Sequence, residues 1–202
     1  ISACLVGSEM CIRDRIKGLI AEYQQFVKGV SFVKRAVTLS DNFNYVFVGL
    51  RRVGKSYLMY QQIHHLIETG ISPEEILFFN FEDERIAGMD TEHFDMIKRC
   101  YEEMYSHRPI FFLDEIQIVP HWEQFVRRLV DQKYRVYVTG SNAKMLSKDI
   151  ATTLGGRFMI QYVYPFSFRE YLSSNGVQLD KLWIYKNRSE VVRHCLLYTS
   201  PS

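Results

Sequence analysis

The feature of the sequence that most limits its fold is an apolar run that opens directly into a glycine-containing loop. The run is Tyr45-Val-Phe-Val48, and the loop is Gly49-Leu-Arg-Arg-Val-Gly-Lys-Ser56. A short, fully apolar run is typical of a strand buried on both faces of a parallel sheet. The stretch from Lys55 to about Thr69, closed by Gly70, then predicts a helix. A strand, a loop and a helix in this order indicate an α/β domain.

The rest of the chain repeats this alternation. The expected strands cover residues 45–48, 76–81, 110–113, 134–139 and 157–164. The expected helices cover residues 16–36, 55–69, 91–106, 120–131 and 143–153, and a further one begins at 166–172. Regular alternation of strands and helices favours a parallel sheet with helices on both faces.

The loop has the pattern and the setting of a phosphate-binding loop. Its residues fit G-x-x-x-x-G-K-[ST] between a strand and a helix, as the mechanism requires. The glycines let the backbone curl around phosphate oxygens, and the helix N-terminus directs partial positive charge at the anion. We expect Lys55 to reach the β- and γ-phosphates and Ser56 to bind Mg²⁺. Arg51 and Arg52 either contact the nucleotide or are solvated loop charges. The residues expected to contact nucleotide are Gly49, Arg52, Val53, Gly54, Lys55, Ser56 and Tyr57.

Two carboxylates follow the third expected strand, Ile110-Phe-Phe-Leu113. The carboxyl edge of a parallel sheet is where ligands bind in open α/β folds. We expect Asp114 to hold Mg²⁺ and Glu115 to act as the general base that polarises the attacking water. Gln117 is either a polar residue at a helix start or a donor near the γ-phosphate.

Polar residues near the last two expected strands are weaker candidates. Asn142 or Ser141 fits a role in sensing the γ-phosphate, with Thr139 less suited, and an N-cap is the alternative reading. Arg157 follows two glycines. It is either a phosphate-stabilising arginine, in its own site or in a neighbour's, or a surface residue beside a turn.

Composition excludes several classes of function. The net charge is +2 over 202 residues, and short basic pairs such as Lys34-Arg35 fall short of a nucleic-acid-binding stripe. No apolar run approaches the roughly 18 residues needed to span a membrane, and no secretory signal is evident. The four cysteines have no metal-site spacing. We therefore expect a cytoplasmic protein without a zinc site, and we predict neither membrane nor nucleic-acid binding.

Both ends of the chain differ from the pattern beside them. Residues 1–15 and 195–202 resemble translated sequencing-adapter read-through and show no clear period of 2 or 3.6. We therefore expect both segments to be non-native and the natural protein to continue beyond His194. Residues 16–175 are expected to form the main domain, and residues 176–194 to begin a lid or a truncated C-terminal domain.

Three segments together resemble the AAA-type ATPase domain of a large prokaryotic family, in which a C-terminal domain of unknown function usually follows. The segments are residues 45–56, 110–129 and 136–172, and the resemblance covers about residues 30–175. It implies a three-layer P-loop NTPase core with a mainly parallel five-stranded sheet of order 5-1-4-3-2. It carries over Gly49, Gly54, Lys55 and Ser56 as nucleotide ligands, Asp114 as metal ligand and Glu115 as catalytic carboxylate, with Asn142 and Arg157 matching more loosely.

Three functions are compatible with these residues. The first is hydrolysis of Mg-ATP coupled to a conformational or assembly switch, favoured because a pure binder needs no water-activating base. The second is an ATP-binding interaction or signalling module with negligible turnover on its own. Phosphate transfer to a small molecule is least favoured, since no acceptor-binding lid is recognisable. ATP is the expected ligand, and a second copy of the chain or another protein is left open as a partner.

Overall fold

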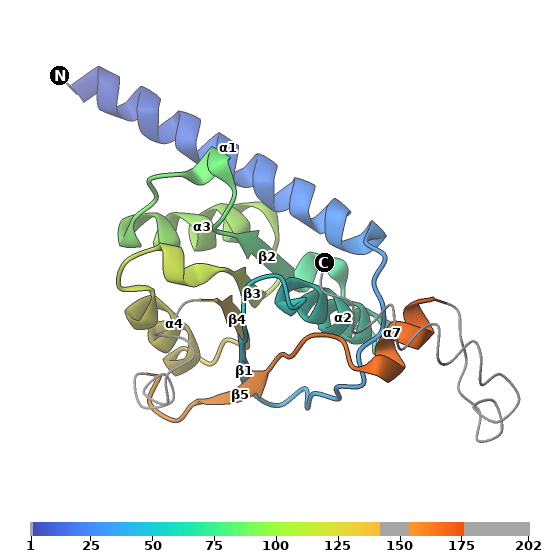
Figure 1. The fold of residues 1–202 in the computed structure, drawn as a ribbon. Helices are drawn as coiled ribbons and strands as arrows, with labels where there is room; N and C mark the ends of the chain where they lie inside the picture. Colours follow the sequence, from blue (N-terminus) through green and yellow to red (C-terminus); the bar gives the residue numbers. More distant parts are fainter. Residues whose placement is uncertain (1, 142–153, 176–202) are drawn as a thin grey trace, which may run out of the picture.

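The computed structural model of the protein describes residues 2–141 and 154–175 (Figure 1). The strands are β1 (Asn44–Val48), β2 (Ile76–Asn80), β3 (Ile110–Asp114), β4 (Val136–Gly140) and β5 (Phe158–Tyr162). The helices are α1 (Ser2–Gly29), α2 (Lys55–Glu68), α3 (Thr91–Met104), α4 (Trp122–Asp131) and α7 (Phe168–Ser174). Short 3-10 helices cover Pro73–Glu75, Glu84–Ile86 and Ile116–Ile118.

The five strands form one sheet in the order β2-β3-β4-β1-β5, and every pairing is parallel. This order confirms the predicted sheet, in which β4 lies between the strand before the phosphate loop and the strand before the carboxylates. The register pairs Val48 with Gly140 and Leu113 with Val138. The carboxyl ends of β1, β4 and β3 therefore lie next to one another, along the edge of the sheet formed by the strand ends.

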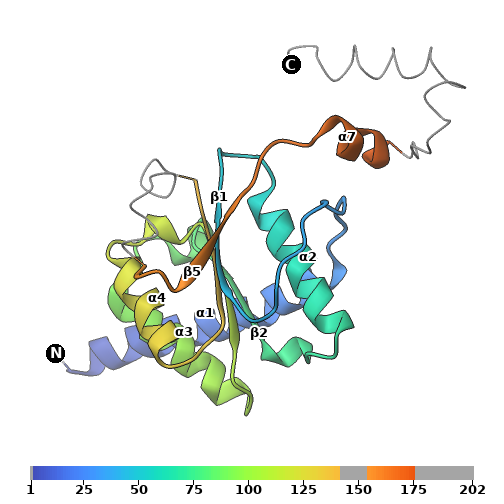
Figure 2. The ribbon, with the colours of Figure 1, turned by 90° about the horizontal axis from the view of Figure 1, so that it is seen from below.

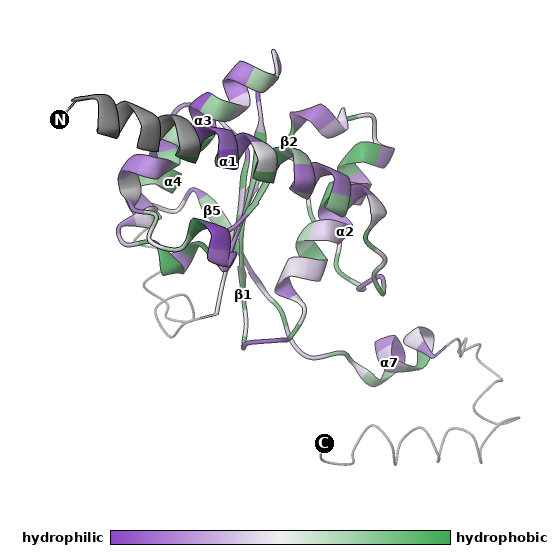
Figure 3. Ribbon diagram, turned by 90° about the horizontal axis from the view of Figure 1, so that it is seen from above, coloured by the Kyte–Doolittle hydropathy of each residue, from purple (hydrophilic) through white to green (hydrophobic). Residues whose placement is uncertain are grey.

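Helices cover both faces of the sheet. Figure 2, seen along the sheet, shows α2 on one face and α3 and α4 on the other. Helix α1 runs across the β2 edge, where it contacts β2 and α3. Hydrophilic residues lie along α1 and α3, on the outside of the domain (Figure 3). Both faces of the sheet are thus removed from water, which is the arrangement that uninterrupted apolar strands require.

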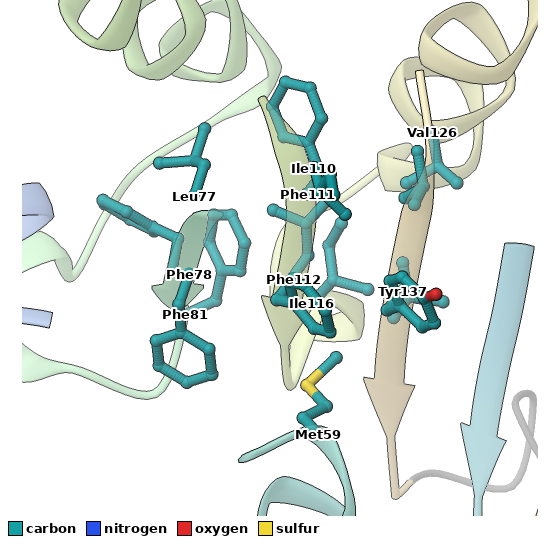
Figure 4. Close-up of a cluster of buried hydrophobic side chains, with 14 of the residues drawn as sticks. Met59, Leu77, Phe78, Phe81, Ile110, Phe111, Phe112, Ile116, Val126 and Tyr137 are labelled. Atoms are coloured by element: carbon teal, nitrogen blue, oxygen red, sulfur yellow. The ribbon is translucent and has the colours of Figure 1, made fainter. Parts of the chain in front are cut away.

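Aromatic side chains fill much of the space between the layers. Phe112 of β3 and Tyr137 of β4 stack with ring centroids 4.4 Å apart. Met59 points toward this cluster from α2 (Figure 4), and all three side chains are completely buried. Close packing of this kind holds β3 and β4 in register, and so sets where the polar residues that follow them lie.

Several expected boundaries were wrong. The helix expected over residues 16–36 begins at Ser2 and ends at Gly29, so residues 2–15 continue the helix that residues 16–29 form. It ends at a glycine before Val30, whose branched side chain is disfavoured in helices. Helix α4 begins two residues late because His121 has a φ of 56°. The helix expected over 143–153 lies outside the described residues.

None of the helices in the described part of the chain contains a stretch that could span a membrane.

A partly exposed ionic contact joins α1 to the loop after β2. The Tyr23 hydroxyl donates a hydrogen bond of 2.6 Å to Asp83 Oδ2, and Arg85 Nη2 donates one of 2.7 Å to the same oxygen. Arg85 also pairs with Glu22 on α1. Hydrogen bonds from Arg85 hold the pKa of Asp83 well below its ordinary value, against an opposing effect of partial burial, and the Tyr23 bond acts in the same direction.

The hydrogen bonds to Asp83 predict that part of the free energy of unfolding is lost at acid pH. Because the pKa of Asp83 is lowered on folding, its contribution is present above the unfolded value of about 3.9 and is lost as pH falls below it. We expect Asp83→Asn to lower the free energy of unfolding at pH 7 by about 1–2 kcal/mol, because Arg85 is partly exposed and its charge is screened by water. The change should also flatten the pH dependence of that free energy below pH 5. Urea unfolding at pH 7 and at pH 3 measures both effects.

Asp131→Asn is the control, because Asp131 forms an exposed pair with Arg157. Such pairs contribute about 0–1 kcal/mol. An equal pH slope in the Asp83→Asn variant and the unmodified chain would contradict the assignment.

Candidate functional site

The loop between β1 and α2 has the backbone that an anion-binding turn needs. Gly54 has a φ of 91°, in the left-handed region, and precedes the first residue of α2 without a side-chain cap. The first amides of α2 therefore point toward the loop with no capping side chain. A helix N-terminus in this state favours negative charge. The local geometry suits phosphate.

Gly49 is required by a close approach of backbone. A Cβ at this position would lie well inside contact distance of the Val163 carbonyl oxygen, and Val163 is held there by its N–H, which donates 2.7 Å to Val48 O. The absence of a side chain at Gly49 thus lets the segment after β5 run alongside the loop.

The closeness of Gly49 to the Val163 carbonyl predicts that a side chain at position 49 lowers the stability of the protein. We expect Gly49→Ala to lower the free energy of unfolding by about 1–3 kcal/mol, because backbone must shift to relieve the overlap. Gly18→Ala is the matched control, since Gly18 lies within α1 and a Cβ there meets nothing within 4 Å. That change should stabilise the protein by about 0.5–1 kcal/mol. If urea unfolding gave the same change in the free energy of unfolding for both variants, the close contact between Gly49 and Val163 would be refuted.

Lys55 lies at the centre of the site. It is only 4% exposed. Its Nζ donates to Leu50 O at 3.1 Å and lies 3.3 Å from Glu115 Oε1. The ammonium therefore reaches across from the loop to the residue that follows β3.

Asp114 ends β3 and is 3% exposed. Burial raises its pKa to about 6, and hydrogen bonds from Thr139 and Ser56 oppose the rise. The Thr139 Oγ1 donates 2.5 Å to Asp114 Oδ1. Ser56 and Asp114, the two predicted metal ligands, are thus in contact with each other. Hydroxyl and carboxylate oxygens are ligands that Mg²⁺ prefers, so the pair fits that ion.

Glu115 is held by contacts at both of its carboxylate oxygens. Oε2 accepts from Gln117 Nε2 at 2.6 Å and from Ser141 Oγ at 2.9 Å, while Oε1 faces Lys55. Burial alone would raise the pKa of Glu115. The bonds from Gln117 and Ser141 and the charge of Lys55 outweigh burial and hold the pKa below its ordinary value. The group is therefore a carboxylate at neutral pH.

The backbone of Glu115 is also constrained. Its φ of 50° and ψ of 40° place a non-glycine residue in the left-handed region, at a cost of about 1–3 kcal/mol. Its N–H donates 2.8 Å to Thr139 Oγ1. Thr139 therefore contacts both acidic residues, although it was the least favoured of the three polar candidates after β4. Asn142 lies outside the described residues.

The structure does not bring Arg157 to this edge. Arg157 precedes β5, whereas the loop and the carboxylates follow β1 and β3, so in a parallel sheet they lie at opposite edges. Its guanidinium pairs with Asp131 at 3.0 Å. A role within its own site is not supported by this position, and action on a neighbouring copy stays a prediction.

A large pocket adjoins the loop. Its volume is about 870 Å³, within the usual range for small-molecule sites. It includes the predicted contact residues Arg52, Val53, Gly54 and Tyr57, and it extends to Ser31–Val33, Arg35, Pro165 and Phe166. Arg51, also in the lining, pairs with Glu82 from the loop after β2.

Residues 31–33, Arg35 and residues 165–166 were not predicted to line this pocket. These residues carry no motif, and nothing in the local sequence shows that the two segments meet at the loop.

This fold and this loop define a P-loop nucleotide-binding domain. A family model described as an AAA domain matches residues 41–172, and the chain belongs to that family. The predicted family is thereby confirmed.

The curated relatives are prokaryotic. An uncharacterized protein of Methanocaldococcus jannaschii is 32% identical over 149 residues, which are 74% of this chain and 32% of the relative. An uncharacterized protein of Haemophilus influenzae is 32% identical over 167 residues, 81% of this chain and 42% of the relative. The chain thus spans less than half the length of either relative.

Similarity to solved structures is distant. The S. cerevisiae Hsp104–ADP complex is 15% identical with a TM-score of 0.49, over 66% of this chain and 21% of that chain. A DNA polymerase III gamma subunit-related protein from Thermotoga maritima is 11% identical with a TM-score of 0.46, over 88% of this chain and 58% of that chain. Likeness at this level carries no functional inference.

Proposed function

We propose that this domain binds Mg-ATP and hydrolyses it to ADP and phosphate, and that the cycle drives a conformational or assembly switch. The observation that carries the proposal is the contact of Lys55 with Glu115 beside the contact of Ser56 with Asp114. A lysine, a hydroxyl and two carboxylates are the groups that phosphoryl transfer to water needs for binding phosphate, holding Mg²⁺ and orienting the water.

In the proposed complex, the triphosphate lies in the loop from Gly49 to Ser56. The amides at the start of α2 donate to its oxygens, and Lys55 turns from Glu115 to the β- and γ-phosphates. Ser56 and Asp114 would hold Mg²⁺, which would supply positive charge to the phosphate oxygens.

Glu115 is the proposed general base. Once Lys55 contacts phosphate, Oε1 is released to accept a proton from water, while Gln117 and Ser141 keep Oε2 in place. The water oxygen bonds to the γ-phosphorus, and the bond from that phosphorus to the oxygen it shares with the β-phosphate breaks. Gln117 Oε1 is buried without a hydrogen-bond partner among the described residues, so one acceptor beside Glu115 is still available.

The pocket beside the loop is the proposed site for the nucleoside. Aromatic and aliphatic side chains supply much of its lining, among them Phe32, Leu50 and Phe166. A flat, mainly apolar base is buried favourably against such surfaces.

One observation favours a second candidate, an ATP-binding interaction or signalling module with negligible turnover alone. Glu115 is paired with Lys55, and Arg157 lies at the opposite edge of the sheet. Turnover that needs an arginine from a second copy, or another protein partner, would be silent in the isolated chain.

The deciding experiment measures ATP affinity and phosphate release on the 202-residue chain with Mg²⁺, over a range of protein concentrations. Binding with turnover supports hydrolysis, and a specific activity that rises with concentration supports a site shared between copies. Binding without turnover favours the second candidate. Absence of ATP binding would overturn both.

A further inference from the structure

Arg35 is a buried cation that the proposed chemistry does not use. It is 7% exposed and lies in the segment between α1 and β1. The sequence indicated only a short basic pair with Lys34. A buried guanidinium is costly unless it is fully paired, so its partners show what it holds together.

Three segments meet at this guanidinium. Nη1 donates 3.0 Å to Val53 O in the phosphate loop, and Nη2 donates 2.6 Å to Tyr164 O after β5. Nε donates 3.0 Å to Glu170 Oε1 on α7. The guanidinium carbon also lies 4.9 Å from the centroid of the Phe166 ring. The rigid fork of arginine suits several fixed acceptors at once.

Both carboxylate oxygens of Glu170 also accept hydrogen bonds. Its Oε1 accepts from Arg35 Nε and, at 3.4 Å, from the Ala36 N–H. Its Oε2 accepts at 2.8 Å from both the N–H and the hydroxyl of Ser167, the N-cap of α7. The carboxylate of Glu170 therefore both pairs with Arg35 and binds the N-cap residue of α7.

These contacts lie around the nucleoside half of the pocket. Residues 31–33, Arg35 and residues 165–166 line it, and the phosphate loop completes the lining. Figure 2 shows the chain between β5 and α7 passing on the α2 side of the sheet, beside the loop between β1 and α2. Arg35 bonds to the loop and to the residue before Pro165, so it sets the spacing between them.

We propose that Arg35 and Glu170 form a clamp that positions the base-binding part of this pocket and couples its occupancy to α7. The inference rests on the proposed ATP binding. Binding of the nucleoside then stabilises the docked α7, and by thermodynamic reciprocity a docked α7 raises affinity for the nucleoside. The clamp acts on the base and not on the phosphates, which bind to the backbone of the loop and to Lys55.

The test compares ATP with inorganic tripolyphosphate, which has no base, on the full chain with Mg²⁺. The main variant is Glu170→Gln, because its amide nitrogen replaces one of the two accepting oxygens and so faces a donor, either Arg35 Nε or Ser167 N–H. We expect ATP affinity to fall about tenfold, the loss of one charge-assisted bond, and tripolyphosphate affinity to stay within about twofold. Arg35→Lys should also lower ATP affinity, because one ammonium cannot replace the fork. It additionally removes the bond to Val53 O in the phosphate loop, so Glu170→Gln is the variant that tests selectivity for the base. Glu68→Gln, an exposed carboxylate at the end of α2, is the control.

Hydrogen exchange of residues 168–174 gives an independent readout. ATP, and not tripolyphosphate, should slow exchange there in the unmodified chain, and Glu170→Gln should remove the difference. A lower melting temperature with unchanged affinities for both ligands would mean a merely structural pair and overturn the clamp. Equal losses for both ligands would also overturn it, by locating the effect in the phosphate loop. If the unmodified chain binds neither ligand, the proposed function fails and the clamp fails with it.

Discussion

Replacing Lys55 with alanine is expected to abolish ATP binding, with an affinity loss of about 100-fold or more. The ammonium is nearly buried and lies at the start of α2, where charge-assisted bonds to phosphate are strongest. Losing two such bonds is worth about 2.7 kcal/mol or more, which corresponds to that factor. Calorimetry or a fluorescent-nucleotide titration with Mg²⁺ measures the change.

The same substitution leaves Glu115 without its cationic neighbour, so folding must be checked by circular dichroism. Lys28→Ala is the matched control, because Lys28 is exposed in the last turn of α1. Its affinity should equal that of the unmodified chain. Retained ATP affinity in a folded Lys55→Ala variant would refute the assignment of the phosphate site.

Replacing Glu115 with glutamine should separate binding from turnover. The amide keeps the shape of the side chain and loses the proton acceptor, so phosphate release should fall by about 10²–10⁴-fold. ATP affinity should change by no more than about threefold, since Glu115 touches water and not phosphate in the proposed complex. Steady-state phosphate release and equilibrium titration on the same preparation give both numbers.

Glu102→Gln, an exposed carboxylate on α3, is the control for the loss of one charge. Unchanged turnover in Glu115→Gln would remove Glu115 as the base, even if ATP binds. If the unmodified chain binds ATP without turnover, the variant cannot be distinguished from it, and the second candidate function is favoured. The Lys55 and Glu115 variants therefore test different halves of the proposal.

The elements around the phosphate loop were predictable because their signals are local. A buried strand, a glycine turn and a helix start are contiguous from Tyr45 to Ser56, and each depends on its own residues. Asp114 and Glu115 are contiguous with β3 in the same way. The position of β4 between β1 and β3 came from the family resemblance, since no local pattern states which strands are neighbours.

The partners of the catalytic carboxylate were not predictable to the same degree. Gln117 lies in the short 3-10 helix Ile116–Ile118, in agreement with the helix-start alternative, and it also donates to Glu115 because the left-handed backbone of Glu115 reverses the chain direction. Thr139 reaches both acids because β3 and β4 are in register. Such contacts follow from side-chain direction at the strand ends, which depends on packing between the layers.

The position of Arg157 could have been anticipated. A residue that precedes a parallel strand lies at the edge opposite to residues that follow one, so Arg157 and the phosphate loop are separated by the length of the sheet. Residue type alone favoured a phosphate contact, and topology decides against one within the same copy.

The sequence by itself determined the alternation of strands and helices, the phosphate loop, and the acidic pair at the end of β3, because each is specified by neighbouring residues. Only the tertiary structure decided that Thr139, Gln117 and Ser141 hold the two carboxylates. It also decided that residues 31–33, Arg35 and residues 165–166 line one pocket, and that Arg35 joins the phosphate loop to α7. The physical reason is distance along the chain. Arg35 and Glu170 are far apart in the sequence and come into contact only in the folded domain. Both side chains are nearly buried there, so each charge needs the other as its partner.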